Sequence, residues 1–544
     1  MDNTKAKGKG KRTMVNLLIT IVIGLVYFYF KLPALNLQDS AFYTFVLLFS
    51  AVYCFLSIVT QGLFKAESGR ELWISIKTHC AAPVIICIVL AVIFVIGSLI
   101  SSPIIRSKAY RDLMDVETGD FTTDIEQISY NQIPLLDEAS AMKLGDKKMG
   151  ELADMVSQFE VADDYTQINF KGQPVRVTPL LYGDFFKWLS NRSKGLPAYI
   201  VIDMVTQEVD AVRLSEGMKY TTSEYFFRNV MRHLRFNYPT FIFDTVSFEI
   251  DEEGTPYWVC PRIVKKVGLF GGADIDGAVL MNAVTGECQF YEEVPTWVDR
   301  VYTASLIMKQ YDYHGMYQNG WFNSFIGQRG VTVTTEGYNY IALNDDVYVY
   351  TGVTSVASDG SNIGFILTNQ RTKATKYYAC AGAQEVAAMS SAEGVVQYMD
   401  YRATFPLLLN ISNQPTYFMA LKDSGGLVKM YAMVNVQQYQ LVASGTTVAE
   451  CERNYINLLS GSNLADESEV SGATVSGVVE DIRTAVIDGN TNVFIKLEKN
   501  NYYYVISVKD SELAVVLSVG DKVEITPSTG EGELRSAYKV ARAK

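Results

Sequence analysis

Three long apolar runs near the start of the chain dominate its pattern of hydrophobic and polar positions. They cover residues 14–30, 42–61 and 82–100, and none contains a charged residue. A helix needs about 20 apolar residues to cross about 30 Å of hydrocarbon, whereas a helix in a soluble core keeps a polar face. The runs therefore predict three transmembrane helices in a membrane anchor that covers residues 1–102.

After residue 102 the pattern changes to short alternating stretches separated by turn residues. Residues 103–170 are predicted to form a connecting region, and residues 171–458 are predicted to be strands joined by turns, with helices between them. The segment 459–473 is small, polar and acidic, which is typical of a linker. Residues 474–544 are predicted to hold about five short strands.

One short pattern occurs three times within this second part of the chain. In residues 200–212, 278–291 and 365–378 an Asp or Asn follows an apolar run, and a Thr stands three positions later: the pairs are Asp203 and Thr206, Asn282 and Thr285, and Asn369 and Thr372. An Asx side chain accepts hydrogen bonds from the backbone two residues on, which favours a turn between two strands. We therefore expect three hairpins in repeated supersecondary units.

Helical periodicity accompanies these hairpins in residues 221–236, 297–311 and 382–399, the first two of which carry an apolar stripe and the third of which is rich in Ala. Helices packed on antiparallel sheets make an α+β architecture, which is the predicted fold class. The glycines of 268–277 lack the GxGxxG spacing of a dinucleotide loop and precede a strand, so they predict a bend.

The last segment, 474–544, has the layout of a small closed barrel. Its length, its strand number and a short insertion before the fourth strand resemble an OB-type barrel. A small SH3-like barrel fits nearly as well.

Basic residues around the apolar runs predict the orientation of the chain. Five Lys or Arg precede the first run and three lie between the second and the third, against one between the first and second and three after the third. Cytoplasmic segments carry the excess of Lys and Arg, so we expect a cytoplasmic N-terminus and residues 103–544 outside the cytoplasm. A cleaved signal peptide is the alternative for the first run; an uncleaved anchor is preferred.

Charge also bears on the partners of the exterior part. Residues 1–102 contain nine Lys or Arg and four Asp or Glu, and the whole chain carries −12, so the other 442 residues carry −17. Such a surface repels phosphates, and no nucleic-acid partner is expected. The seven cysteines are scattered, which favours buried thiols, although Cys260 and Cys288 can bridge if neighbouring strands bring them together.

Signatures of catalysis are scarce. The exterior has two histidines, His233 and His314, and the chain contains neither HExxH nor GxSxG, so no metal, cofactor or hydrolase triad is expected. Acidic pairs remain as candidates for acid and base: Glu292 with Glu293, Asp345 with Asp346, and Asp274 with Asp276. Neighbours on a strand point to opposite faces, which argues against a catalytic couple.

An aromatic loop at 313–325 is the best candidate for a ligand surface. Tyr313, Tyr317, Trp321 and Asn323 combine rings with an amide, as in surfaces that contact sugars or peptides. The alternative is that these rings pack against sheet faces.

Two stretches carry a resemblance to known proteins. Residues 255–302, with "TPYWVCP", "GLFGGADIDGAVLMNAVTGE" and "PTWVDRVY", resemble a group of uncharacterised Gram-positive membrane proteins. Residues 364–378 and 405–436 extend this resemblance, which covers roughly residues 100–540. The Asx-x-x-Thr-Gly-Glu hairpin is similar to PepSY domains, small α+β modules of peptidase propeptides and envelope proteins. The resemblance implies PepSY-like modules over 171–458 and an envelope location, and it implies no catalytic residues.

Three functions are compatible with these observations. The favoured one is a non-enzymatic, membrane-anchored cell-envelope protein that binds another protein or forms homo-oligomers. The second is a regulator or inhibitor of an extracytoplasmic peptidase. The third is a cell-wall enzyme that uses acidic residues.

Overall fold

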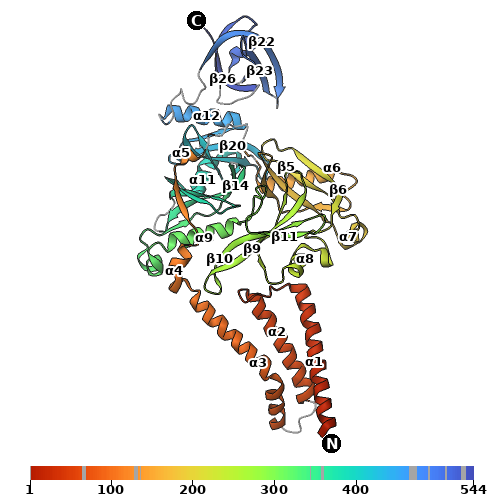
Figure 1. Ribbon diagram of the computed structural model, residues 1–544. Coiled ribbons are helices and arrows are strands. Elements are labelled where there is room, and N and C mark those ends of the chain that lie inside the picture. The colour runs from red at the N-terminus through yellow and green to blue at the C-terminus, as the bar shows by residue number, and fades with distance from the viewer. Residues whose placement is uncertain are drawn as a thin grey trace.

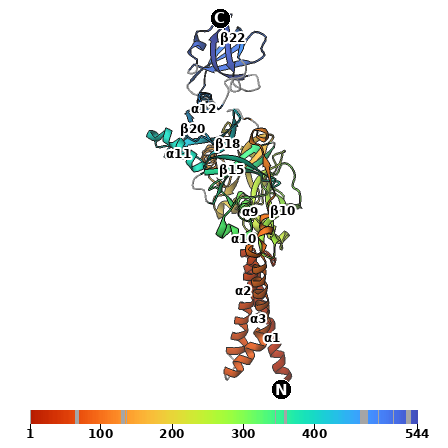
Figure 2. The ribbon, with the colours of Figure 1, turned by 90° about the vertical axis from the view of Figure 1, so that its left-hand side faces the viewer.

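The computed structural model describes residues 2–63, 69–125, 127, 133–134, 136–343, 345–356, 361–462, 464, 474–487, 490–508, 511–527 and 534–543. A stalk of helices stands at the end that holds the N-terminus, a body of sheets lies in the middle, and a small barrel occupies the opposite end (Figure 1). The view turned by 90° shows the same order of parts (Figure 2).

The stalk consists of α1 (Asp2–Lys31), α2 (Ser40–Ser57), a π-helical continuation η1 (Ile58–Leu63) and α3 (Gly69–Ile100). Lys11–Lys31, Ser40–Thr60 and Ile76–Ile100 are long and apolar enough to cross a membrane. Most of their side chains are not covered by protein, as lipid-facing helices require. The three predicted spans are confirmed in length and composition.

Within the described residues, the body contains four sheets that repeat one strand topology. In each sheet the first and second strands pair with different halves of the third, and the fourth and fifth follow as antiparallel neighbours. Unit 1 comprises β2 (Phe159–Val161), β3 (Thr166–Phe170), β4 (Gln173–Tyr182), β5 (Leu196–Asp203) and β6 (Val209–Met218). Unit 2 comprises β7 (Ile242–Phe243), β8 (Ser247–Ile250), β9 (Pro256–Val267), β10 (Gly271–Asn282) and β11 (Cys288–Tyr291).

The other two units have the same plan. Unit 3 comprises β12 (Thr332–Thr334), β13 (Asn339–Leu343), β14 (Asp346–Ser355), β15 (Ser361–Asn369) and β16 (Thr375–Ala383). Unit 4 comprises β17 (Arg402–Ala403), β18 (Leu407–Ile411), β19 (Gln414–Lys422), β20 (Val428–Asn435) and β21 (Val442–Gly445). The predicted repetition is therefore present, with one copy more than the three hairpins indicated.

A helix precedes each unit, and a further helix follows the last one. The preceding helices are α6 (Glu138–Glu151), α8 (Val230–Asn237), α9 (Ala304–Met316) and α11 (Glu385–Val395), and the last is α12 (Val448–Gly461). Within unit 1, α7 (Phe185–Asn191) joins β4 to β5. Unit 1 thus includes α6, β2 and β3 from the segment predicted as a connecting region.

The units are joined in pairs by shared cores. Buried side chains of units 1 and 2, such as Ile168 and Trp258, belong to one apolar cluster. Those of units 3 and 4, such as Phe365 and Tyr417, belong to another. Removing these surfaces from water is the main driving force for such pairing.

A segment from outside the repeats extends the sheet of unit 3. After α3, the short helix α4 (Pro103–Arg111) leads to β1 (Val116–Gly119) and α5 (Phe121–Asp124). Strand β1 pairs in parallel with β16, from Val116 opposite Thr375 to Gly119 opposite Tyr378. The outer edge of unit 3 is therefore covered by an added strand.

The C-terminal segment is a closed five-stranded barrel. Its strands are β22 (Val475–Ile487), β23 (Asn490–Leu497), β24 (Tyr503–Ser507), β25 (Lys522–Pro527) and β26 (Leu534–Arg542), in the order β22-β23-β24-β26-β25. A 3₁₀ turn, η6 (Glu512–Val516), precedes β25. Residues 463 and 465–473 of the predicted linker lie outside the described residues.

Two predicted helices are shorter than expected. The segment 221–236 becomes α-helical only at Val230, after a 3₁₀ turn at Phe226–Arg228, because Phe226 has a φ of +56° and Asn229 caps the α-helix by accepting the N–H of Arg232. The segment 297–311 becomes helical only at Ala304, after Thr303.

The suggested Cys260–Cys288 bridge is wrong. Both residues are free thiols. Cys260 on β9 and Cys288 on β11 pair with opposite sides of the intervening strand β10. Two strand spacings amount to about 10 Å, beyond the reach of a disulfide.

Candidate functional site

The predicted Asx hairpins form as the sequence indicates. Asn282 Oδ1 accepts the backbone N–H groups of Val284 and Thr285, both at 2.9 Å. Asp203 and Asn369 accept the two equivalent bonds at 2.7–2.9 Å. These side chains satisfy backbone groups of their own turns, so their role is structural.

A fourth hairpin of this kind was missed by the sequence analysis. Asn435, at the end of β20, accepts the N–H groups of Gln437 and Gln438 at 3.1 and 2.8 Å. The Thr that marks the other copies is absent here, since Gln438 stands in its place. The strand-Asn pattern alone is too common to indicate the copy.

The glycine-rich stretch is a turn, as predicted, and it docks the body on the stalk. Gly268 and Gly272 have φ values of +63° and +59°, which favour glycine. Between them, the backbone N–H groups of Leu269 and Phe270 donate to Ser101 Oγ at 2.8 and 3.0 Å. The tip of the β9–β10 hairpin is thereby fixed to the end of α3.

The ring of Phe270 extends this contact to α2. Its centroid lies 5.1 Å from that of Phe94 and 5.7 Å from that of Tyr43. A Cβ at Gly97 would lie 2.6 Å from the Phe270 ring, so a larger residue there displaces the ring. The glycines thus permit close packing of a hairpin against two membrane helices.

The acidic residues that were candidates for catalysis have different surroundings, and three of them are held in ion pairs. Asp276 is paired with Arg262, Asp274 lies 2.7 Å from Lys373 Nζ, and Asp346 binds Arg371 through two bonds of 2.7 Å. Glu292 and Glu293 are exposed in the bend that follows β11. Asp345 is exposed and lines a cavity of about 500 Å³ between units 1, 3 and 4.

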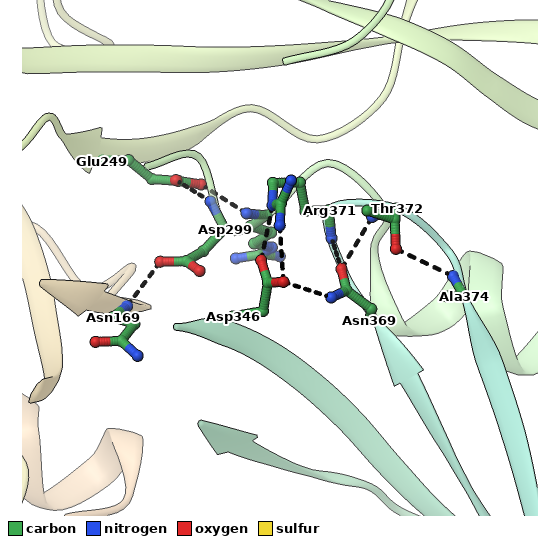
Figure 3. Close-up of polar contacts among 9 residues, drawn as sticks. Asn169, Glu249, Asp299, Asp346, Asn369, Arg371, Thr372 and Ala374 are labelled. Carbon is green, nitrogen blue, oxygen red and sulfur yellow. Dashed lines mark hydrogen bonds and ion pairs between the residues drawn. The ribbon is translucent and has the colours of Figure 1, made fainter. Parts of the chain in front are cut away.

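A buried carboxyl pair that the sequence analysis did not single out lies where units 1, 2 and 3 meet (Figure 3). Glu249 on β8 accepts the N–H groups of Asp299 and Arg300 at 2.8 and 3.1 Å and the hydroxyl of Ser247 at 3.2 Å. Asp299 Oδ2 accepts the N–H of Asn169 on β3 at 2.6 Å. Asp299 Oδ1 has no hydrogen-bond partner within the described residues.

Burial determines the protonation of this pair. Desolvation raises the pKa of Glu249 and that of Asp299, and the charge of Glu249 raises the pKa of Asp299 further. Glu249 accepts three hydrogen bonds and Asp299 accepts one, so the proton that this pair retains is assigned to Asp299. Asp299 is 1% exposed, and a substrate has no access to it. The pair joins three units and is not an active site.

A cavity of about 780 Å³ runs along β6. Its floor is one face of the unit 1 sheet, with Tyr199, Val201, Val212 and Leu214. The opposite wall is formed by the β8–β9 turn and by the Asx turn of unit 2, and charged residues at the rim include Asp210. We call this cavity the β6 groove.

The four residues of the predicted aromatic surface do not form one exposed surface. Tyr317 is buried, and Tyr313 stacks on it with ring centroids 5.9 Å apart. Asn323 is engaged by its own loop, since its Nδ2 donates to Arg329 O at 2.9 Å. Trp321 is half-buried and stacks on Phe325, whose ring is exposed. The structure thus places the four residues together, but mainly as support for a neighbouring loop.

The residues described here contain no group of three His, Cys, Asp or Glu side chains arranged to hold a metal ion. No protein-family model matches the chain, and no curated protein matches it either.

Proposed function

We propose that this protein is a non-enzymatic, membrane-anchored cell-envelope protein whose exterior units bind an extended segment of a partner protein in the β6 groove. The observation that supports this proposal most is that the groove runs along β6, the outer strand of the unit 1 sheet. Strand β6 pairs with β5 on one side, and no described strand pairs with its other side. A free edge of this kind is a template for an added strand.

The fold itself contains a precedent for strand addition. In unit 3 the equivalent edge strand, β16, is already extended by β1. Unit 1 has the same strand order, and its edge strand covers ten residues. A peptide added to β6 would direct alternate side chains toward the face that carries Val212 and Leu214.

The chemistry of the groove suits such a segment. Its floor is apolar, with Val201, Val212 and Leu214 half-buried, while Asp210 and Glu216 at the rim are exposed. Backbone pairing supplies affinity and the apolar floor supplies selectivity for alternate side chains. The favoured ligand is therefore an extended peptide with apolar residues at every second position.

Two finer assignments belong to this proposal. The units, each a helix with an antiparallel sheet and an Asx hairpin, are PepSY-like modules. The barrel is OB-like: its five strands, with η6 before the fourth, support this assignment.

Charge and the direction of the helices support the proposed location. The body contacts the C-terminal ends of α1 and α3, since Arg235 Nε donates to Leu32 O at 2.9 Å and the hairpin tip binds Ser101. With three spans, the body lies across the membrane from the N-terminus, whose basic residues favour the cytoplasm.

Photocrosslinking in intact cells tests the proposal. A benzophenone amino acid at Leu214 faces the groove, whereas the same group at the exposed Asp154 does not line it. We expect discrete crosslinked partners from position 214 and not from position 154. Equal crosslinking from both positions, or none from position 214, contradicts the groove assignment.

The identity of the crosslinked species separates the remaining versions. A second copy of this chain indicates self-assembly. A peptidase indicates the regulatory role, and a decrease in peptidase activity on addition of the protein would then support that role. A cell-wall enzyme is favoured only by the exposed Asp345 beside its cavity. If Asp345→Asn abolishes the cellular function of the protein while the fold stays intact, the enzymatic role is supported over binding.

A further inference from the structure

We propose that the loop after α9 forms a second contact with the lipid bilayer, beside the three spans. The loop consists of α10 (Gly320–Phe322) and a π-helical turn, η4 (Asn323–Gly327). It presents Phe322, Phe325 and Ile326, which are 69%, 76% and 77% exposed. The proposal rests on the stalk spanning a bilayer, and it assigns the interfacial region of the leaflet next to the body as the site.

The position of the loop agrees with this assignment. It packs near α4, which begins at Pro103, three residues after the last residue of the third span. Figure 2 shows α10 at the junction of the stalk and the body. The loop that carries the exposed side chains therefore lies close to the end of the third span.

Helix α4 continues the apolar surface of the loop. Ile104 and Ile105 are 57% and 63% exposed, and they closely follow the apolar C-terminal part of α3. Clusters of exposed aromatic and aliphatic side chains on a soluble surface are costly and mark interaction sites. Here the cluster is continuous with the surface that the spans present to lipid.

The loop is built to hold these side chains outward. Asn323 accepts the N–H of Arg329 at 3.2 Å and donates to its carbonyl at 2.9 Å, and Asn319 donates to the same carbonyl at 3.0 Å. Trp321 stacks on Phe325 and belongs with Tyr317 to the apolar cluster below. A preformed loop inserts without the entropic cost of ordering.

Charge around the loop complements anionic headgroups. Arg106, Lys108 and Arg329 are exposed near the apolar residues. Basic residues beside inserted aromatic side chains are typical of interfacial lipid contacts. We therefore expect deeper insertion into bilayers that contain anionic lipid.

Spin-label depth measurements on the full-length protein in vesicles test the proposal. A nitroxide is attached at Phe325→Cys, with Ile326→Cys as a second site and labelled wild-type protein as the background. Tyr398→Cys is the matched control, because Tyr398 is an aromatic residue that is 81% exposed on unit 4. Val92→Cys, in the third span, reports independently whether that helix lies in lipid.

We expect high oxygen and low water-soluble nickel accessibility at position 325, and the reverse at 398. Adding phosphatidylglycerol to phosphatidylcholine vesicles increases the depth at 325, and Arg106→Gln with Lys108→Gln removes that increase. If the label at position 325 is in water while the label at position 92 is in lipid, the proposal is overturned, and the assignment of the third span to the membrane still holds. Shielding of position 325 from both oxygen and nickel indicates a protein contact, such as a second copy, and also overturns it.

Discussion

Burial and the neighbouring carboxylate of Glu249 both favour the protonated form of Asp299 in the folded protein. The pKa values of Asp299 and Glu249 are raised, whereas a carboxyl group in the unfolded chain has a pKa of about 4. Between these limits the folded state binds more protons than the unfolded state, so stability falls as pH rises from about 4 toward the raised pKa values. One retained proton contributes up to about 1.4 kcal/mol per pH unit.

The substitution Asp299→Asn is expected to remove most of this dependence. An amide keeps the oxygen that accepts the N–H of Asn169 and carries no charge. Thermal unfolding in detergent, measured from pH 5 to 8, is expected to show a smaller decrease than for wild-type protein. The exposed Glu253→Gln is the control. An unchanged slope in Asp299→Asn contradicts the assignment of the proton.

Among the elements, the hairpins were predictable because a local interaction creates them. Asp203, Asn282 and Asn369 bond to their own turns, so the sequence pattern carries the information. The helix before unit 2 was predicted too long because its first part, 221–229, is an irregular segment with a short 3₁₀ turn at Phe226–Arg228 and with Phe226 at positive φ. The groove and the buried Glu249–Asp299 pair depend on contacts between units, which a single sequence does not reveal.

Asn282→Ala tests the contribution of one Asx turn. The change removes the acceptor for two backbone N–H groups and is expected to destabilise the protein by about 1–2 kcal/mol. Asn282→Asp keeps the acceptor, as Asp203 does in unit 1, and should unfold near the wild-type temperature. Equal destabilisation by Ala and Asp would show that the side-chain oxygen is not what holds the turn.

The whole molecule depends on the docking of the body onto the stalk. Ser101→Ala leaves the N–H groups of Leu269 and Phe270 without their acceptor, at a cost of about 1–3 kcal/mol. Hydrogen exchange at the hairpin tip should then accelerate by about one to two orders of magnitude, since about 1.4 kcal/mol corresponds to a factor of ten. Ser98→Ala, at an exposed position of α3, serves as control. Unchanged exchange in Ser101→Ala contradicts the proposed anchor point.

The orientation of the molecule is the central claim, because a binding role in the envelope requires the body to lie outside the cytoplasm. Protease treatment of intact cells stripped of their wall, with one epitope tag at each end of the chain, measures it directly. The account predicts that the C-terminal tag beyond the barrel is lost while the N-terminal tag survives, and that lysis exposes both. A C-terminal tag that resists protease until lysis contradicts it.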